Sequence, residues 1–353
     1  SRQVSEATCG CGAMARCIVL CCLLWTVAAH SRPAFNESIA RLFASTAQAA
    51  YCGDNEETKQ QLLDWTCEPC KSNGVSVVPG SMRLINAPEM GQVNSSFIYV
   101  VRFNHPRHSF DHSKQGCLVV YRGSETITNW LHNFDIMLAL ANNSACPGCR
   151  VHDGFWKLTE STMPEVLRNL NEIGCVPGRA EEDELEGTLE DGPLPDTSSL
   201  YVTGHSLGAA MSQIAMYMLM DRGYDVKQAY NFESPRVGNA AWAENFDRKF
   251  SDKIPYFRVT SGEDPIVHTP PTFYPFDYVH TNYEAHIEQD GYILQCPNTE
   301  DKNCADRYGL EAICGVWYPW QGTLEAHIHQ CIDKAHERHC LNKLAYGGDI
   351  CHC

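Results

Sequence analysis

The sequence is poor in basic residues. Its 353 residues contain 27 Lys and Arg against 43 Asp and Glu, which gives a formal net charge of −16. Because nucleic acids and anionic membranes attract proteins largely through Lys and Arg, this composition argues against both as partners. Internal repeats are also lacking. The 44% of hydrophobic residues is enough to build a substantial core.

Long apolar runs are lacking too, except near the start of the chain. From Met14, one arginine is followed by an apolar run over residues 17–29 and then by small residues. This pattern predicts a secretory signal peptide, too short for a membrane span, with residues 1–13 lying upstream of it. We therefore expect an exported protein without a permanent membrane span. Residues 1–31 are the upstream segment and leader, and 32–353 form one domain.

Cysteine usage agrees with export. Five of the 19 cysteines lie in the leader, so 19 − 5 = 14 remain, and an even number in an exported chain predicts disulfides. Short loops predict three local disulfides: Cys67–Cys70, Cys146–Cys149 and Cys296–Cys304. The first two pairs also have the spacing of zinc knuckles or redox motifs, but export and the lack of partner pairs favour disulfides. Three sequons that permit N-glycosylation begin at Asn36, Asn94 and Asn142.

Strand-like and helix-like segments alternate along the chain. The expected strands lie within 96–103, 117–123, 199–205, 227–232 and 254–260, and the expected helices within 36–50, 157–173, 206–222 and 239–250. This alternation predicts an α/β fold with a mainly parallel central sheet flanked by helices. An acidic, Gly- and Pro-rich stretch at 176–198 predicts a flexible insertion within the one domain.

The stretch SLYVTGHSLGAAMSQIAMY, residues 199–217, places one serine between a buried strand and a buried helix. Ser206 has Gly204 and Gly208 two positions to either side, which is the G-x-S-x-G pattern of a nucleophile elbow. Gly and Ser are also common at ordinary strand-to-helix turns. The flanking strand and apolar helix favour Ser206 as a nucleophile.

A serine nucleophile needs a base and an acid. The expected strand 254–260 ends in a turn that holds Asp264, with Glu263 as the neighbouring alternative. His268 follows Asp264 too closely to reach back to Ser206. The base is expected further along the chain, where the candidates are His327, His329, His336 and His339.

Six motifs occur in one order between Ala34 and Cys340. They are AAYC (49–52), VVYRGSETITNWLHNFD (119–135), GCRVHDGF (148–155), GHSLGAA (204–210), SPRVGN (234–239) and DPIVHTPP (264–271). Together they resemble the fungal-type, or class 3, lipases, which include secreted triacylglycerol lipases and feruloyl esterases. The resemblance implies an α/β-hydrolase fold and a triad of Ser206, Asp264 and His327, with no cofactor or metal. Counting back from Cys340 gives His329 in place of His327.

The resemblance also implies an oxyanion hole, a lid and one long-range disulfide. The oxyanion donors are the backbone N–H of Leu207 and Ser124. The apolar lid residues are Ile127, Trp130 and Leu131. Trp130 could instead pack in the core. Cys52 is expected to pair with the C-terminal region at Cys340. The implied activity is hydrolysis of acylglycerol esters, with a lipid or ester substrate as the partner.

Some alternatives stay open. A phospholipase A1, a feruloyl or cell-wall esterase, or a catalytically silent binding protein could share this fold. His327, His329, Cys331 and Cys340 could instead hold a metal, although disulfides and the triad compete for these residues. Glu233 stands where related sequences have glycine. A carboxylate there could perturb the pKa of a His or Asp side chain, or it could pair with a nearby base such as Arg236, and we expect the second.

Overall fold

We describe a computed structural model of the chain. The residues that it describes are 34–53, 56–86, 97–104, 115–123, 138–140, 146–178, 199–288 and 290–308. The expected leader and the C-terminal stretch from residue 309 lie outside these ranges, and so does most of the expected acidic insertion at 176–198.

A nine-stranded sheet runs through the described residues in the order β1-β3-β4-β7-β8-β10-β12-β13, with β2 also paired to β3. Its strands are β1 (Ser76–Val77), β2 (Arg83–Asn86), β3 (Phe97–Asn104), β4 (Gln115–Tyr121), β7 (Ser199–His205), β8 (Asp225–Phe232), β10 (Tyr256–Ser261), β12 (Glu284–Ile287) and β13 (Ile293–Cys296). Strands β4, β7, β8, β10 and β12 are parallel, whereas the pairings at both edges are antiparallel. The five expected strands are confirmed, and the centre of the sheet is parallel.

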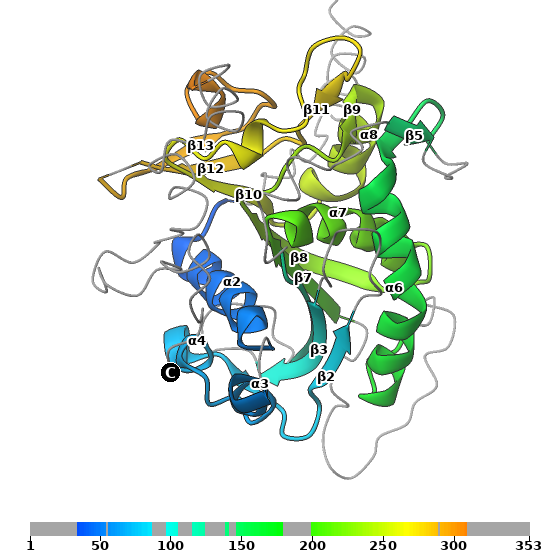
Figure 1. Cartoon of the computed structure of the whole chain (residues 1–353), viewed down its shortest axis with the longest axis vertical. Coiled ribbons are helices and arrows are strands. Elements are labelled where there is room, and N and C mark those ends of the chain that lie inside the picture. Colours follow the sequence, from blue (N-terminus) through cyan, green and yellow to red (C-terminus); the bar gives the residue numbers. More distant parts are fainter. Residues whose placement is uncertain are drawn as a thin grey trace, which may run out of the picture. The chain divides into compact units, whose positions relative to one another are not determined.

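Helices cover both faces of the sheet (Figure 1). They are α2 (Glu37–Ala49), α3 (Glu56–Leu63), α4 (Glu68–Lys71), α6 (Asp153–Glu172), α7 (Leu207–Met220) and α8 (Ala240–Phe246), the last continued by a π-helical turn at Asp247–Ser251. Helix α2 contacts β7 and β8 from one face, and α7 contacts the same strands from the other, with α6 packed on α7.

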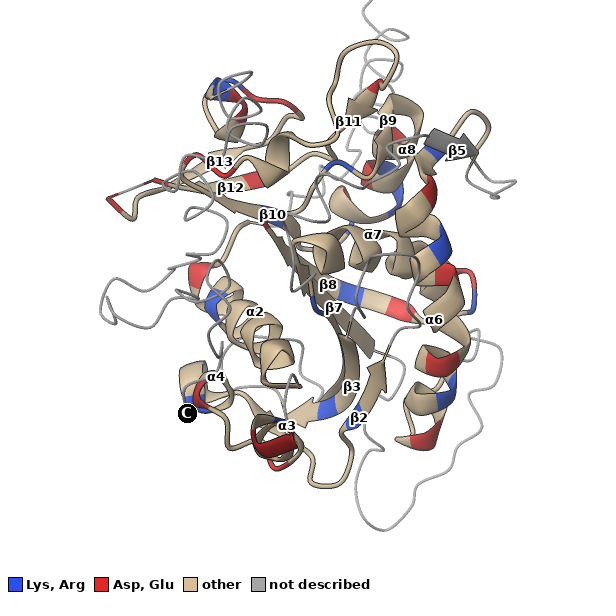
Figure 2. Ribbon diagram, in the orientation of Figure 1, with Lys and Arg blue, Asp and Glu red and all other residues tan. Residues whose placement is uncertain are grey.

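The alternation of side chains along the strands divides the core into two layers. In β4, Val119 and Tyr121 face the layer of α6 and α7, whereas Leu118 and Val120 face that of α2. Every residue of α7 except Met220 is buried. Because α7 is buried, it carries no charged residue, whereas α6 carries acidic and basic residues on its outer face (Figure 2).

A second, four-stranded antiparallel sheet was not expected from the sequence. It joins β5 (Leu138–Leu140), β6 (Arg150–His152), β9 (Gly238–Asn239) and β11 (Tyr278–Val279) in the order β11-β9-β6-β5. Its strands have only two or three residues, too few for an alternating pattern to be visible in sequence.

Four disulfides occur among the described cysteines. The three local pairs are as expected: Cys67–Cys70, Cys146–Cys149 and Cys296–Cys304. The fourth, Cys117–Cys175, was missed because the two cysteines are 58 residues apart, and it joins the start of β4 to the segment after α6. Cys52 is buried in the short 3-10 helix (Ala50–Gly53) that follows α2, and its expected partner Cys340 lies outside the described residues.

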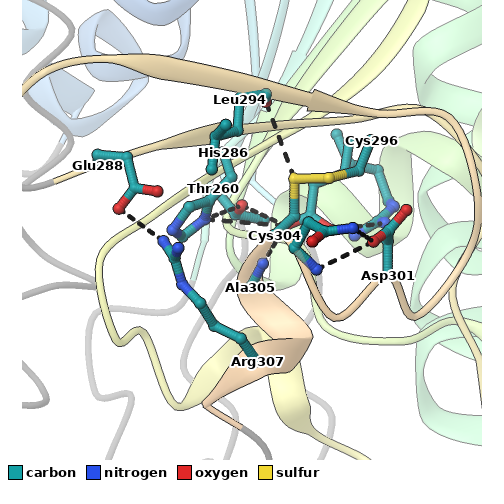
Figure 3. Close-up of a disulfide and its surroundings, with 12 residues drawn as sticks. Thr260, His286, Glu288, Leu294, Cys296, Asp301, Cys304, Ala305 and Arg307 are labelled. Atoms are coloured by element: carbon teal, nitrogen blue, oxygen red, sulfur yellow. Dashed lines mark hydrogen bonds and ion pairs between the residues drawn. A yellow bond between two sulfur atoms is a disulfide. The ribbon is translucent and has the colours of Figure 1, made fainter.

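The Cys296–Cys304 disulfide fastens the segment after β13 to the edge of the sheet (Figure 3). Beside it, Arg307 pairs with Glu288 at 2.6 Å, and Thr260 Oγ1 lies 2.9 Å from His286 Nδ1 between β10 and β12. These contacts hold the last described residues against β12. None of the described helices is both long enough and apolar enough to cross a membrane.

His152 caps helix α6, which begins four residues earlier than the expected start at residue 157. Its Nδ1 accepts hydrogen bonds from the N–H groups of Gly154 (3.1 Å) and Phe155 (3.4 Å). Accepting both requires a neutral Nδ1. Burial of the ring lowers the pKa of His152 to about 3.

This burial predicts acid sensitivity. In the folded state His152 stays neutral down to about pH 3, whereas in the unfolded chain it gains a proton near pH 6.5. Its stabilising contribution is therefore complete above about pH 6.5 and is lost as the pH falls toward 3, by at most about 1.4 kcal/mol per pH unit. The variant His152→Asn keeps a capping oxygen but does not titrate. Chemical unfolding between pH 7 and 4 should show a shallower acid slope for this variant, and an unchanged slope would contradict the assignment.

Candidate active site

Ser206 occupies a sharp turn between β7 and α7. Its backbone has φ 56° and ψ −128°, in the left-handed range of φ that is uncommon for residues other than glycine. The Ser206 N–H donates to the carbonyl of Phe232 on β8 (2.9 Å), and its own carbonyl accepts from Ala209 N–H (2.9 Å) in the first turn of α7. The strand, turn and helix thus have the geometry expected of a nucleophile elbow.

Two glycines let the chain turn this tightly. A Cβ on Gly204 would overlap the carbonyl group of Gly208, and a Cβ on Gly208 would overlap the carbonyl group of Tyr121 on β4. Helix α7 therefore lies directly against the ends of β7 and β4. The two glycines that flank Ser206 in the sequence are therefore needed because neither position has room for a side chain.

Asp264 lies in the turn after β10, two strands away from Ser206. Its side chain is completely buried, and Oδ1 accepts a hydrogen bond from Ile266 N–H at 2.8 Å. The alternative acid, Glu263, is exposed to solvent. Because β7, β8 and β10 are parallel neighbours, their carboxyl ends lie on the same side of the sheet. Ser206 and Asp264 follow two of these ends and therefore lie on that side.

One expected oxyanion donor is described and the other is not. Leu207 is the first residue of α7, so its N–H belongs to the free donors at a helix N-terminus. Ser124 lies outside the described residues, but Gly123 before it is described and packs on the elbow. A Cβ on Gly123 would be 2.9 Å from Cβ of Ser206.

Tyr51 is a site residue that the sequence reasoning missed, although it lies in the AAYC motif. Its hydroxyl is 2.6 Å from Nδ1 of His205, the residue before Ser206, and it accepts a hydrogen bond from Gly123 N–H at 3.2 Å. One buried hydroxyl therefore links the elbow to the end of β4. A motif of two alanines, a tyrosine and a cysteine gives no local sign of a contact 154 residues away.

The expected base lies outside the described residues, as do the alternatives His329, His336 and His339. Of the nearer histidines, His268 is buried. Burial, followed by the charge of Arg236, lowers the pKa of His268 to about 4, so its ring is neutral at pH 7. The lid residues Ile127, Trp130 and Leu131 also lie outside the described residues.

The expectation that Glu233 pairs with Arg236 is wrong. The guanidinium of Arg236 binds both oxygens of Glu300, at 2.9 and 2.7 Å, and donates to the carbonyls of His268 and Pro270. Glu233 instead accepts a hydrogen bond from Ser261 Oγ at 2.8 Å. Glu233 is buried between the strands, and its side chain is directed away from Arg236, which is three residues further along the chain.

Within the described ranges, no group of three or more His, Cys, Asp or Glu side chains is arranged to hold a metal ion. The residues considered for a metal site, His327, His329, Cys331 and Cys340, lie outside those ranges.

The parallel sheet, the elbow after β7 and the buried acid after β10 define an α/β-hydrolase fold. Residues 118–274 match the sequence profile of the family described as "Lipase (class 3)", which confirms the resemblance seen in the motifs. The matched region runs from β4 past Asp264 and includes Ser206 and Leu207.

Comparisons with individual proteins agree. The chain is 28% identical over 224 residues to the secreted mono- and diacylglycerol lipase A of Penicillium cyclopium, covering 62% of this chain and 63% of that protein. It is 27% identical over 248 residues to the secreted mono- and diacylglycerol lipase 1 of Fusarium solani, covering 70% and 62%. The crystal structure of a lipase from Rhizopus microsporus var. chinensis superposes with a TM-score of 0.57 at 20% identity, covering 87% and 94%. The match thus spans less than two thirds of the two Penicillium and Fusarium relatives.

The elbow predicts that Gly208→Ala is far more damaging than an ordinary helix substitution. The added methyl group has no room beside the Tyr121 carbonyl, so α7 must move away from β4. We expect a loss of about 3 kcal/mol or more in the free energy of unfolding, at the upper end for overpacked cores because the overlap is with backbone atoms. Ala210→Gly, two residues further along the same helix, is the control and should cost about 1 kcal/mol. Equal effects in thermal unfolding would show that the close contact is not essential.

Proposed function

We propose that the protein is a secreted serine hydrolase that cleaves carboxylic esters of acylglycerols. Ser206 on its strained elbow is the observation that carries the proposal, because this turn holds the hydroxyl at the edge of the sheet, beside a helix N-terminus. The named activities and secretion of the fungal relatives support the same substrate class and location.

In this proposal, Ser206 Oγ attacks the ester carbonyl while His327 takes its proton. Asp264 orients His327 and stabilises its imidazolium form. The negative oxygen of the tetrahedral intermediate accepts hydrogen bonds from the backbone N–H groups of Leu207 and Ser124. The alcohol leaves with a proton from His327, and water then hydrolyses the acyl-enzyme by the same steps. The buried position of Asp264 and the exposure of Glu263 support this choice of acid.

The first test is Ser206→Ala in the secreted protein. Because the hydroxyl is the nucleophile, hydrolysis of a short soluble ester should fall by about 10³-fold or more while the melting temperature stays close to that of the unmodified protein. His327→Ala should cause a similar loss, and His329→Ala should retain most activity. An active Ser206→Ala variant, or a serine-directed phosphonate that fails to label Ser206, would refute the mechanism. The reverse result for the two histidines would move the base to His329.

The substrate class is tested through the proposed lid. Exposing an indole to water costs about 2 kcal/mol, so a lid that carries Trp130 should remain closed until lipid covers its apolar residues. Hydrolysis of a long-chain acylglycerol should rise sharply once the substrate exceeds its solubility limit. Trp130→Ala should weaken this rise and leave much of the rate on a short soluble ester. If the rate of hydrolysis by the unmodified protein does not rise at the solubility limit, the result would favour a feruloyl esterase or another hydrolase of soluble esters.

A further inference from the structure

The loop at residues 271–277 presents aromatic side chains to solvent. Phe273 is 51% exposed, and Tyr274, the next residue, is 86% exposed. The other exposed large hydrophobic side chains among the residues that the structure describes are far apart in the chain: Leu63, Val176 and Tyr292. Single exposed apolar side chains are ordinary on a protein surface, whereas neighbouring ones mark interaction sites. The loop at 271–277 is therefore a candidate interaction surface.

The backbone of the loop fixes these side chains in their exposed positions. Phe276 N–H donates to the carbonyl of Phe273 at 2.9 Å, and this tight turn places the two rings 5.7 Å apart between centroids. Tyr278 N–H donates to the carbonyl of Pro271 at 3.3 Å and closes the loop. The side chains are thus held ready for a partner, which reduces the entropy lost on binding.

The base of the loop is fastened to the body of the domain. The guanidinium of Arg236 is buried and donates to the carbonyl of Pro270 at 3.0 Å, immediately before the loop. After the loop, Tyr278 and Val279 form β11, which pairs with β9 (Figure 1). The loop therefore has a firm attachment at each of its ends.

The loop is attached on the side of the sheet where Ser206 and Asp264 lie. The segment that contains it leaves the carboxyl end of β10, and the segment that contains β9 leaves the carboxyl end of the neighbouring strand β8. Because the two segments start on the same side of the sheet and pair with each other, they hold the loop on that side. A partner bound to the loop would thus face the side of the sheet that carries the proposed nucleophile.

The charge of the loop favours an uncharged partner. The sequence PTFYPFD at 271–277 has no Lys or Arg, and its one acid, Asp277, has its carboxylate 3.8 Å from the guanidinium of Arg150. The bend that leads into β11 is almost entirely tan in Figure 2. With a net charge of −16, the chain as a whole would be repelled by anionic headgroups. Aromatic side chains bind well at the boundary between acyl chains and water.

We propose that the loop at 271–277 anchors the protein on an uncharged lipid surface, with Phe273 and Tyr274 inserted among the lipids. The inference rests on the proposed function, since an enzyme that cleaves insoluble acylglycerols meets them at a surface. The anchor needs no conformational change, because its side chains are exposed before the lipid is reached. Insertion removes their apolar surface from water, which is the source of the affinity.

The test measures binding in the absence of hydrolysis. Ser206→Ala protein is mixed with droplets of trioleoylglycerol coated with phosphatidylcholine, and the bound fraction is measured by flotation. In this background, Tyr274→Ser should weaken binding by about 3-fold or more, and Phe273→Ser combined with Tyr274→Ser by about 10-fold or more. The melting temperature of Tyr274→Ser should be unchanged, because this side chain is exposed. Unchanged binding by the double variant would overturn the inference.

Tyr292→Ser is the matched control. Tyr292 is 63% exposed in the turn between β12 and β13, and its N–H donates at 2.9 Å to the carboxylate of Asp290, which is also exposed. A charged group resists transfer out of water, so this turn should not enter the lipid. Tyr292→Ser should therefore bind droplets as well as its Ser206→Ala parent. An equal loss of binding in Tyr292→Ser and Tyr274→Ser would contradict an anchor at 271–277.

Two further measurements test the kind of partner. Replacing phosphatidylcholine with anionic phosphatidylglycerol should weaken binding at low salt, and stronger binding would refute an uncharged surface as the partner. A second copy of the chain is the alternative occupant. If sedimentation shows a dimer that Tyr274→Ser converts to a monomer, while droplet binding is unchanged, the loop is a dimer contact and the lipid anchor is refuted.

Hydrolysis of a short soluble ester separates this inference from the proposed function. If Ser206→Ala abolishes hydrolysis but the double variant of the loop still binds droplets as its parent does, the serine mechanism survives and the anchor is refuted. If Ser206→Ala remains active but the double variant no longer binds droplets, the mechanism is refuted and the loop is still a lipid-binding surface.

Discussion

The hydrogen bond from Ser206 N–H to the carbonyl of Phe232 is the constraint on which the site depends. It extends the pairing of β7 with β8 by one residue past the end of β7, so the chain reaches the elbow while still fastened to its neighbour. The backbone reverses into α7 only after this bond, and the positions of Gly204 and Gly208 beside the turn have no room for a side chain. The direction of α7, the position of its free N–H groups and the strain at Ser206 all follow from that fastening.

Residues that lie far apart in the sequence meet on the side of the sheet where the parallel strands have their carboxyl ends. Tyr51 comes from the short 3-10 helix after α2, Gly123 from the end of β4 and Asp264 from the turn after β10. Parallel strands make this convergence possible, since their carboxyl ends all lie on one side. The buried hydroxyl of Tyr51 then couples two of these segments without any charge, which avoids the cost of an isolated buried ion.

Local sequence patterns sufficed to predict the strand-to-helix turn at Ser206 and the turn that holds Asp264. The apolar strand before Ser206 and the glycines around it predicted the elbow, and the turn after the expected strand 254–260 drew attention to Asp264. Contacts between distant segments left no such trace. The partner of Arg236 proved to be Glu300, 64 residues away, and not the nearby Glu233. Cys117–Cys175 escaped notice for the same reason, because spacing favours only cysteines that are close in sequence.

The Cys117–Cys175 disulfide also has a consequence for proteolysis. It closes a covalent loop that contains residues 124–145, the stretch with the proposed lid and oxyanion serine. A protease that cuts once within this stretch yields two fragments that remain joined through Cys117 and Cys175. Such a nicked chain would keep its original mass on a non-reducing gel and separate into two bands only after a reductant is added. The chain can therefore be cut in this segment and still keep β4 and β7 in a single covalent molecule.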